Sequence, residues 1–271
     1  MLIPILLVLL GVVVGASGTL IGVGGGFLLM PILLWAYPNE SPDILTSISL
    51  AVVFFNSLSG SIAYARMKRI EFKSGFAFAA AGLPGTILGA LSTSYIPRRT
   101  FDLIIGLMLV AASIFLMVRS ANKNSSNRTT GNEPWQISFT DALGEHHRFG
   151  YYPWRGIVLS FAVGYLSSIL GIGGGIIHVP ALVHMLNFPV HIATATSHFI
   201  LVMMSFSGSM THLFAGDIGP GVGRIIPLAI GVIGGAQIGA HLSKKIHGNW
   251  ITRGLAIALI MVGIRTLWRF F

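Results

Sequence analysis

Residues 20–31 read Leu-Ile-Gly-Val-Gly-Gly-Gly-Phe-Leu-Leu-Met-Pro, and residues 169–180 read Ile-Leu-Gly-Ile-Gly-Gly-Gly-Ile-Ile-His-Val-Pro. Each stretch carries four glycines in five positions and lies inside a longer apolar segment. Because glycine costs about 1 kcal/mol relative to alanine at each helical position, such a run is not typical of a continuous helix. The two stretches therefore predict a membrane helix that is interrupted at the same place in two halves of the chain.

The composition indicates an all-α, polytopic integral membrane protein. Of the 271 residues, 54% are hydrophobic and only 9% are charged, whereas a soluble domain is about one quarter charged. Several apolar stretches exceed the ~18 residues that indicate a membrane span. The net charge of +9 falls mostly in short loops between these spans, where basic residues orient a membrane protein, so it does not indicate a nucleic-acid partner.

The first apolar segment, Leu2 to Tyr37, is too long for one crossing and too short for two, and a break at the glycines removes this mismatch. The segment Trp154 to Leu186 has the same character. Counting each broken segment once, we expect about eight membrane segments. The other six predicted spans are Ile44 to Ala65, Ser74 to Ser94, Thr100 to Val118, Ile192 to Phe214, Ile225 to Ser243 and Ile251 to Trp268.

The two halves align with each other at offsets of 148 to 150 positions, for example Gly24 with Gly173 and Thr46 with Thr194. We therefore predict two homologous membrane repeats, residues 1–119 and residues 154–271. Between them, residues 120–153 form a polar linker with a short hairpin turning at Asp141 to Glu145. If each broken segment crosses once, the repeats are parallel; if each is a re-entrant hairpin, they are inverted. Both alternatives place the linker in the cytoplasm and the protein in the inner (plasma) membrane.

The glycine runs are candidate anion sites. A helix that begins inside the membrane leaves its first backbone N–H groups without partners, and a bound anion would accept their hydrogen bonds. Two such helix starts could face one site, as in transporters built from repeats. The alternative is that the glycines only allow close helix packing. The predicted backbone donors are Gly24, Gly25, Gly26, Gly173, Gly174 and Gly175.

Hydroxyl groups at the start of the helix that follows each broken segment could complete the coordination of an oxyanion without burying a fixed charge. The alternative for each one is a hydrogen bond to a carbonyl of its own helix. His198, within an apolar span, is either a proton partner in anion transport or the donor of a single hydrogen bond. The predicted side-chain donors are Thr46, Ser49, Thr194, Thr196, Ser197 and His198.

The second repeat also contains histidines that could indicate a cation or metal permease. Their spacing does not follow one helix face, and no Asp or Glu lies within an apolar span, which disfavours a metal site. No phosphate-binding loop or hydrolase motif is present, so neither an enzyme nor a cofactor is expected. The expected partners are a small anion, the lipid bilayer and a coupled proton, and a homo-oligomer is compatible with this interpretation.

The chain resembles the sulfite exporter TauE/SafE family. The resemblance rests on Gly15-Ala16-Ser17-Gly18 leading into residues 22–31, and on Gly164 leading into residues 171–180 with Ala193 to Ser197 downstream. It implies a secondary transporter that moves sulfite or another sulfur-containing oxyanion or organosulfonate. His178 and His198 depart from the apolar residues expected at those places. Combined with the repeats, the resemblance predicts alternating access between the two halves.

Overall fold

The computed structural model describes residues 2–120, 134–142, 144, 146–243, 260, 263 and 264. Within these residues, a long helix, a short helix and two long helices follow one another twice along the chain. The elements of the first half are α1 (Leu2–Ile21), α2 (Gly26–Ala36), α3 (Pro42–Arg66), α4 (Phe72–Thr93) and α5 (Arg98–Ser120). Those that follow are β1 (Trp135–Thr140), β2 (His146–Tyr151), α6 (Pro153–Leu170), α7 (Gly175–Met185), α8 (Val190–Ala215), η1 (Gly219–Gly221) and α9 (Val222–Leu242).

These elements agree with the spans expected from the sequence, and both apolar segments are interrupted at their glycines. The all-α prediction needs one correction, because the hairpin foreseen in the linker is a two-stranded antiparallel sheet that pairs Trp135 with Tyr151. The predicted span Ile251 to Trp268 lies almost entirely outside the described residues.

The distribution of polar side chains is that of a membrane protein. Among the described residues, six helices are long and apolar enough to cross a membrane, and the two short apolar helices are α2 and α7. In α3 the buried positions include Ser49, Asn56 and Ser57, whereas Leu58 and Ile62 are exposed. Polar groups thus lie inside the helix bundle and apolar groups cover it, as a lipid environment requires.

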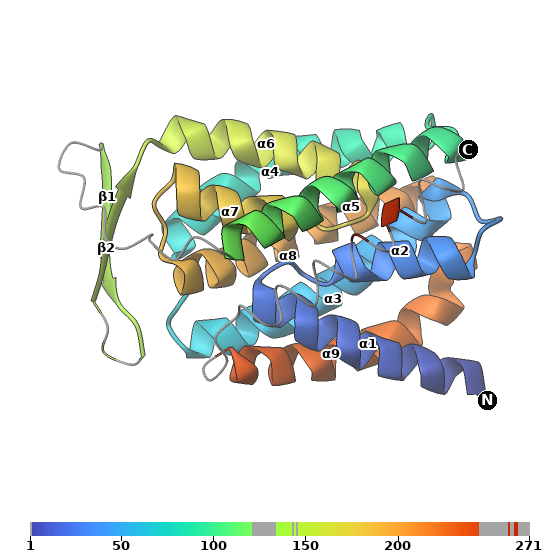
Figure 1. The fold of residues 1–271 in the computed structure, drawn as a ribbon, viewed down its shortest axis with the longest axis horizontal. Coiled ribbons are helices and arrows are strands. Elements are labelled where there is room, and N and C mark those ends of the chain that lie inside the picture. Colours follow the sequence, from blue (N-terminus) through green and yellow to red (C-terminus); the bar gives the residue numbers. More distant parts are fainter. Residues whose placement is uncertain are drawn as a thin grey trace.

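The first broken segment is a helical hairpin that starts and ends at the same end of the bundle. Gly15 packs on Val232 and Gly11 packs on Gly231, so α1 runs parallel to α9 (Figure 1). Arg224, near the start of α9, pairs with Glu40 in the α2–α3 loop. Both α1 and α9 therefore start at the end of the bundle where α2 stops and α3 begins, which we call the Glu40 end.

The second broken segment enters from the opposite end. Gly156 packs on Phe78 and Gly164 packs on Gly82, so α6 runs parallel to α4 and both start beside the β-hairpin (Figure 1). α7 returns to the same end, where the Asn187 side chain donates a hydrogen bond to the Gly150 carbonyl. We call this the hairpin end. The two broken segments therefore point in opposite directions, which corresponds to the inverted alternative.

The β-hairpin is packed against the bundle. Phe149 and Tyr151 contact Phe188 in the loop between α7 and α8, and Arg69 pairs with Asp141 at the hairpin turn. Burial raises the pKa of Tyr151 to about 12, and its hydroxyl is hydrogen-bonded to Ser74. The hairpin thus bridges the α3–α4 loop and the α7–α8 loop.

Substitutions at two neighbouring glycines of α9 distinguish the effect of helix packing on stability from the effect of helix propensity. A Cβ on Gly235 would lie 2.3 Å from the Val12 carbonyl oxygen of α1, whereas a Cβ on Gly234 would meet nothing within 4 Å. We expect Gly235→Val to lower the melting temperature in detergent strongly, at a cost of more than ~3 kcal/mol by overpacking. Gly234→Val is the matched control, and its melting temperature should stay close to that of the wild type. Equal melting temperatures for both variants would contradict the α1–α9 contact.

Candidate functional site

The two breaks have the same backbone conformation. In the first, the φ angles of Gly22, Gly24 and Gly25 are 88°, 80° and 80°, and in the second those of Gly171, Gly173 and Gly174 are 64°, 81° and 67°. A residue with a side chain pays a steric cost at such angles, so these positions require glycine for conformational reasons alone. All residues from 22 to 26 and from 171 to 175 are buried.

The two breaks also touch each other. A Cβ added to Gly26 would lie 2.5 Å from the carbonyl oxygen of Ile172, and one added to Gly175 would lie 2.6 Å from the Cα of Val23. Backbone thus meets backbone, and the starts of α2 and α7 lie side by side in the interior. The structure brings together the six predicted glycine donors, which lie about 149 positions apart in the sequence.

Several backbone amides at the breaks have no acceptor in the part of the chain that the structure describes. The amides of Gly22 and Val23 donate to the Gly18 carbonyl, at 3.0 and 2.8 Å, and thereby close the end of α1. Two of the six predicted donors are already paired, because the Gly24 amide also donates to the Gly18 carbonyl, at 3.3 Å, and the Gly175 amide donates to the Gly173 carbonyl, at 2.8 Å. The amides of Gly25 and Gly26 in one break and of Gly173 and Gly174 in the other are not paired with any described group. Buried amides without partners are costly, so this is where a ligand with acceptor oxygens is most favourable.

The hydroxyl residues of the two halves pack crosswise on the breaks. Thr194 of α8 lies against Gly22, and Thr46 of α3 lies against Gly171. The Thr46 hydroxyl itself donates to the Pro42 carbonyl at 2.8 Å, so only its carbon atoms face the break. Ser49 instead donates its hydroxyl to the Gly171 carbonyl, which holds the second break onto α3.

Thr196 and Ser197 have different surroundings. The Thr196 hydroxyl accepts a hydrogen bond from the Glu71 amide at the start of α4, so the structure does not bring it to either break. The Ser197 hydroxyl is fully buried and has no hydrogen-bond partner among the described residues. Ser197 is therefore available to a ligand, whereas Thr196 serves to hold α4 and α8 together.

A buried polar cluster, consisting of Thr19, Asn56, Ser57 and His198, lies beside the first break. The Ser57 hydroxyl oxygen would be 3.3 Å from a Cβ on Gly24. Neither this hydroxyl nor the Asn56 side-chain nitrogen has a partner among the described residues. Asn56 accepts from the Thr19 hydroxyl at 3.2 Å, and His198 Nε2 lies 3.3 Å from the same hydroxyl.

The sequence did not single out Ser57, and it made Asn56 as easily a helix-packing residue as a site residue. One sequence pattern could have identified both Asn56 and Ser57. Ser49, Val53, Asn56 and Ser57 follow the spacing of one helix face, and Val53 touches Gly24, Gly26 and Gly173. This face of α3 therefore lies along both breaks.

The histidines of the second half do not converge. His178 Nε2 lies 3.0 Å from the Ser160 hydroxyl, and His212 Nδ1 lies 2.8 Å from Asp217, while His198 faces Thr19. No group of three or more potential metal ligands occurs among the described residues. Buried imidazoles in such separate surroundings suit hydrogen bonding or proton transfer better than shared coordination of a cation.

Known proteins resemble the chain over nearly its whole length. A family model described as "Sulfite exporter TauE/SafE" matches residues 7–266. "Probable membrane transporter protein YunE" of Bacillus subtilis is 30% identical over 272 residues, covering 97% of each chain. A "Probable membrane transporter protein" of Methanocaldococcus jannaschii is 28% identical over 271 residues, covering 96% of this chain and 93% of that protein. No solved structure matches the chain.

Proposed function

The chain belongs to the sulfite exporter TauE/SafE family of membrane transporters, and on that premise we propose that it carries sulfite or a related sulfur oxyanion or organosulfonate. In this proposal the anion binds where the two glycine breaks meet. The observation that carries the proposal is the pair of buried breaks whose amides at Gly25, Gly26, Gly173 and Gly174 have no acceptor among the described residues. An oxyanion would supply several acceptors to donors that lie in two adjoining breaks.

Neutral donors beside the breaks support an anionic substrate. Ser57 and Asn56 place unpaired donor groups in the polar cluster beside the first break, and a carboxylate at these positions would repel an anion. A binding site made of amides and hydroxyls holds an anion without a fixed positive charge, and so also allows its release. This is the property that a carrier needs, because a site that binds too tightly does not turn over.

We further propose that the chain contains two homologous repeats, with the two re-entrant hairpins counted among about eight membrane segments. Each hairpin packs on a long helix of the other half, α1 on α9 and α6 on α4. Such exchange suits alternating access, because a movement of one half displaces the hairpin of the other half. The substrate site would then be reached in turn from the Glu40 end and from the hairpin end.

The hairpin end is proposed to face the cytoplasm of a cell bounded by an inner (plasma) membrane. Four basic residues lie between the end of α3 and the first turn of α4 at this end, namely Arg66, Lys68, Arg69 and Lys73. The proposed linker, residues 120–153, adds further basic residues. Cytoplasmic loops carry an excess of Lys and Arg. With this orientation the Glu40 end opens to the outside.

Counterflow in proteoliposomes tests the proposal. Vesicles loaded with unlabelled sulfite should accumulate labelled sulfite from outside through a saturable process, and added metal chelators should not change the rate. A carrier that responds only to divalent cations would refute the proposal and favour the alternative of a cation or metal permease. Flux that does not saturate and shows no exchange would instead indicate a channel.

A further inference from the structure

The same pattern of side chains recurs in α3 and α8, the two helices that contact the breaks. Each has an apolar residue between two serines, at the spacing of four positions that keeps side chains on one helix face. The apolar residue is Val53 in α3 and Leu201 in α8, 148 positions later, and the same offset relates Thr46 to Thr194. The serines are Ser49 and Ser57 in α3 and Ser197 and Ser205 in α8.

Val53 is shared by the two breaks. Its methyl groups are among the nearest atoms to a Cβ built on Gly24, Gly26 or Gly173, at 3.3, 2.7 and 2.7 Å. Leu201 Cδ1 is the nearest atom to a Cβ built on Gly24, at 3.0 Å. Both apolar side chains are fully buried. A ligand held by the free amides of the two breaks therefore has methyl groups as close neighbours.

The neighbouring hydroxyls leave this apolar place without a donor of its own. Ser49 and Ser205 each donate to a backbone carbonyl. The Ser57 hydroxyl has no partner among the described residues, and its oxygen lies 3.3 Å from a Cβ built on Gly24. Hydrogen-bond donors and methyl groups therefore lie next to each other where the two breaks meet.

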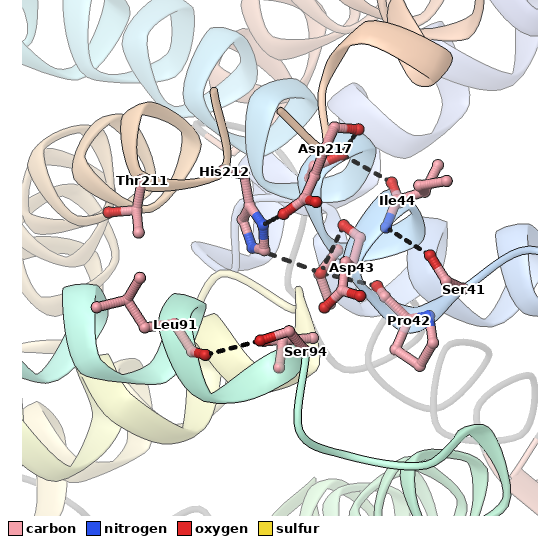
Figure 2. Close-up of polar contacts among 12 residues, drawn as sticks. Ser41, Pro42, Asp43, Ile44, Leu91, Ser94, Thr211, His212 and Asp217 are labelled. Atoms are coloured by element: carbon pink, nitrogen blue, oxygen red, sulfur yellow. Dashed lines mark hydrogen bonds and ion pairs between the residues drawn. The ribbon is translucent and has the colours of Figure 1, made fainter. Parts of the chain in front are cut away.

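Charged side chains do not compensate for the missing donor. Among the described residues, the only buried charged side chains besides histidines are Arg69 and Asp141, at the hairpin end. Figure 2 shows Asp43 and Asp217 at the start of α3, and Val53 lies nearly three turns further along that helix. The methyl groups thus face the site without a cation beside them.

The fourth substituent on sulfur decides how well an anion fits such a place. Sulfite and organosulfonates have three charged oxygens, and their fourth position is a lone pair or a carbon atom. Sulfate has a fourth charged oxygen, which would lose its water against the methyl groups without gaining a donor. An unpaired buried charge of this kind is costly, whereas the other three oxygens can pair with the donors in every case.

We propose that Val53 and Leu201 are specificity-determining residues that face the fourth position on sulfur, so that the transporter carries sulfite and small organosulfonates and rejects sulfate. The size of the two side chains limits the substituent that this position accepts. This inference rests on the proposed function for the place of the anion, and it names the residues that choose among sulfur oxyanions.

Competition in counterflow measures this selectivity. Unlabelled methanesulfonate should inhibit the uptake of labelled sulfite by the wild type, and sulfate should need at least a tenfold higher concentration for the same inhibition. Leu201→Asn replaces a methyl group with an N–H donor on a side chain of similar shape, so it should lower this concentration ratio at least fivefold. Methanesulfonate that does not inhibit, sulfate that inhibits equally well, or an unchanged ratio in folded Leu201→Asn would overturn the proposal.

Val53→Ala tests the size limit without burying a new polar group. It should lower the concentration of butanesulfonate needed for half-inhibition at least fivefold relative to that of methanesulfonate. Val52→Ala is the matched control, because Val52 is buried in the same helix and is not among the nearest atoms to any glycine of the breaks. Its ratio should equal that of the wild type. If the two variants behave alike, Val53 does not face the substituent and the proposal fails.

Two results separate the failures. Wild-type sulfite counterflow that sulfate and methanesulfonate inhibit equally overturns the selectivity and leaves sulfite transport standing. Absence of sulfite counterflow in the wild type refutes the proposed function, and melting temperatures in detergent then decide the selectivity alone. At equal, low millimolar concentrations methanesulfonate should raise the wild-type melting temperature and sulfate should not, and any other pattern overturns the inference.

Discussion

Gly24→Ala is expected to lower sulfite counterflow at least tenfold while the protein remains folded in detergent. The added methyl group would lie 3.0 Å from Leu201 Cδ1 and 3.3 Å from the Ser57 hydroxyl oxygen, which are side-chain atoms that can shift. The φ of 80° adds about 1–2 kcal/mol of backbone strain. The protein should therefore still fold, with a distorted first glycine break. A tenfold loss of counterflow corresponds to about 1.4 kcal/mol of lost substrate stabilisation.

Gly144→Ala is the matched control for this variant. Gly144 has a φ of 83° and lies in the turn of the β-hairpin, where an added Cβ meets nothing within 4 Å. It carries the same backbone strain and should lose a similar amount of stability with unchanged counterflow. Wild-type counterflow in Gly24→Ala would assign the glycine run to packing. Gly174 is a poorer choice, because its Cβ would press on Val163 and Ser167 of α6.

Ser57→Ala is expected to reduce counterflow about tenfold without reducing stability. The Ser57 hydroxyl is buried and lacks a partner among the described residues, so removing it removes a desolvation penalty of about 1–3 kcal/mol. The melting temperature should stay equal or rise. A hydrogen bond to a charged ligand contributes about 1.5–3 kcal/mol. Its loss should lower counterflow without lowering the melting temperature.

Ser59→Ala, two positions further on, should show the opposite pattern. The Ser59 hydroxyl donates to the Ile233 carbonyl at 2.8 Å and accepts from Gln237 at 2.9 Å, so it joins α3 to α9. Its removal should cost about 1–2 kcal/mol of stability and leave counterflow intact. If Ser57→Ala instead destabilises the protein and transports normally, Ser57 is a structural residue and the polar cluster is not part of the substrate site.

The interrupted segments could be predicted from the sequence because a glycine run inside an apolar stretch has few other structural meanings. The end of the bundle from which each segment enters could not be predicted. Re-entrant and crossing versions of the same segment place the basic loop after α3 on the same side, so the positive-inside rule does not separate them. The packing of α1 along α9 and of α6 along α4, together with the Arg224–Glu40 pair and the Asn187–Gly150 hydrogen bond, shows that the two broken segments enter from opposite ends.

The candidate site was predicted in part for a similar reason. The glycines and Ser49 lie at or beside the breaks, but the Ser49 hydroxyl, predicted as a donor to the anion, donates to the Gly171 carbonyl. Thr194 and Thr196 are two positions apart and cannot share a helix face, and the sequence does not say which of them faces inward. Asn56 and Ser57 reach the first break only because α3 packs along it, and such tertiary contacts have no local sequence signal.

A structure of the protein with selenite, an analogue of sulfite whose selenium scatters anomalously, tests most directly whether the two breaks form the anion site. We predict one selenium peak between residues 22–26 and residues 171–175, with selenite oxygens about 3 Å from the amides of Gly25 and Gly174. A peak confined to another part of the bundle, with these amides turned away from it, would contradict this assignment.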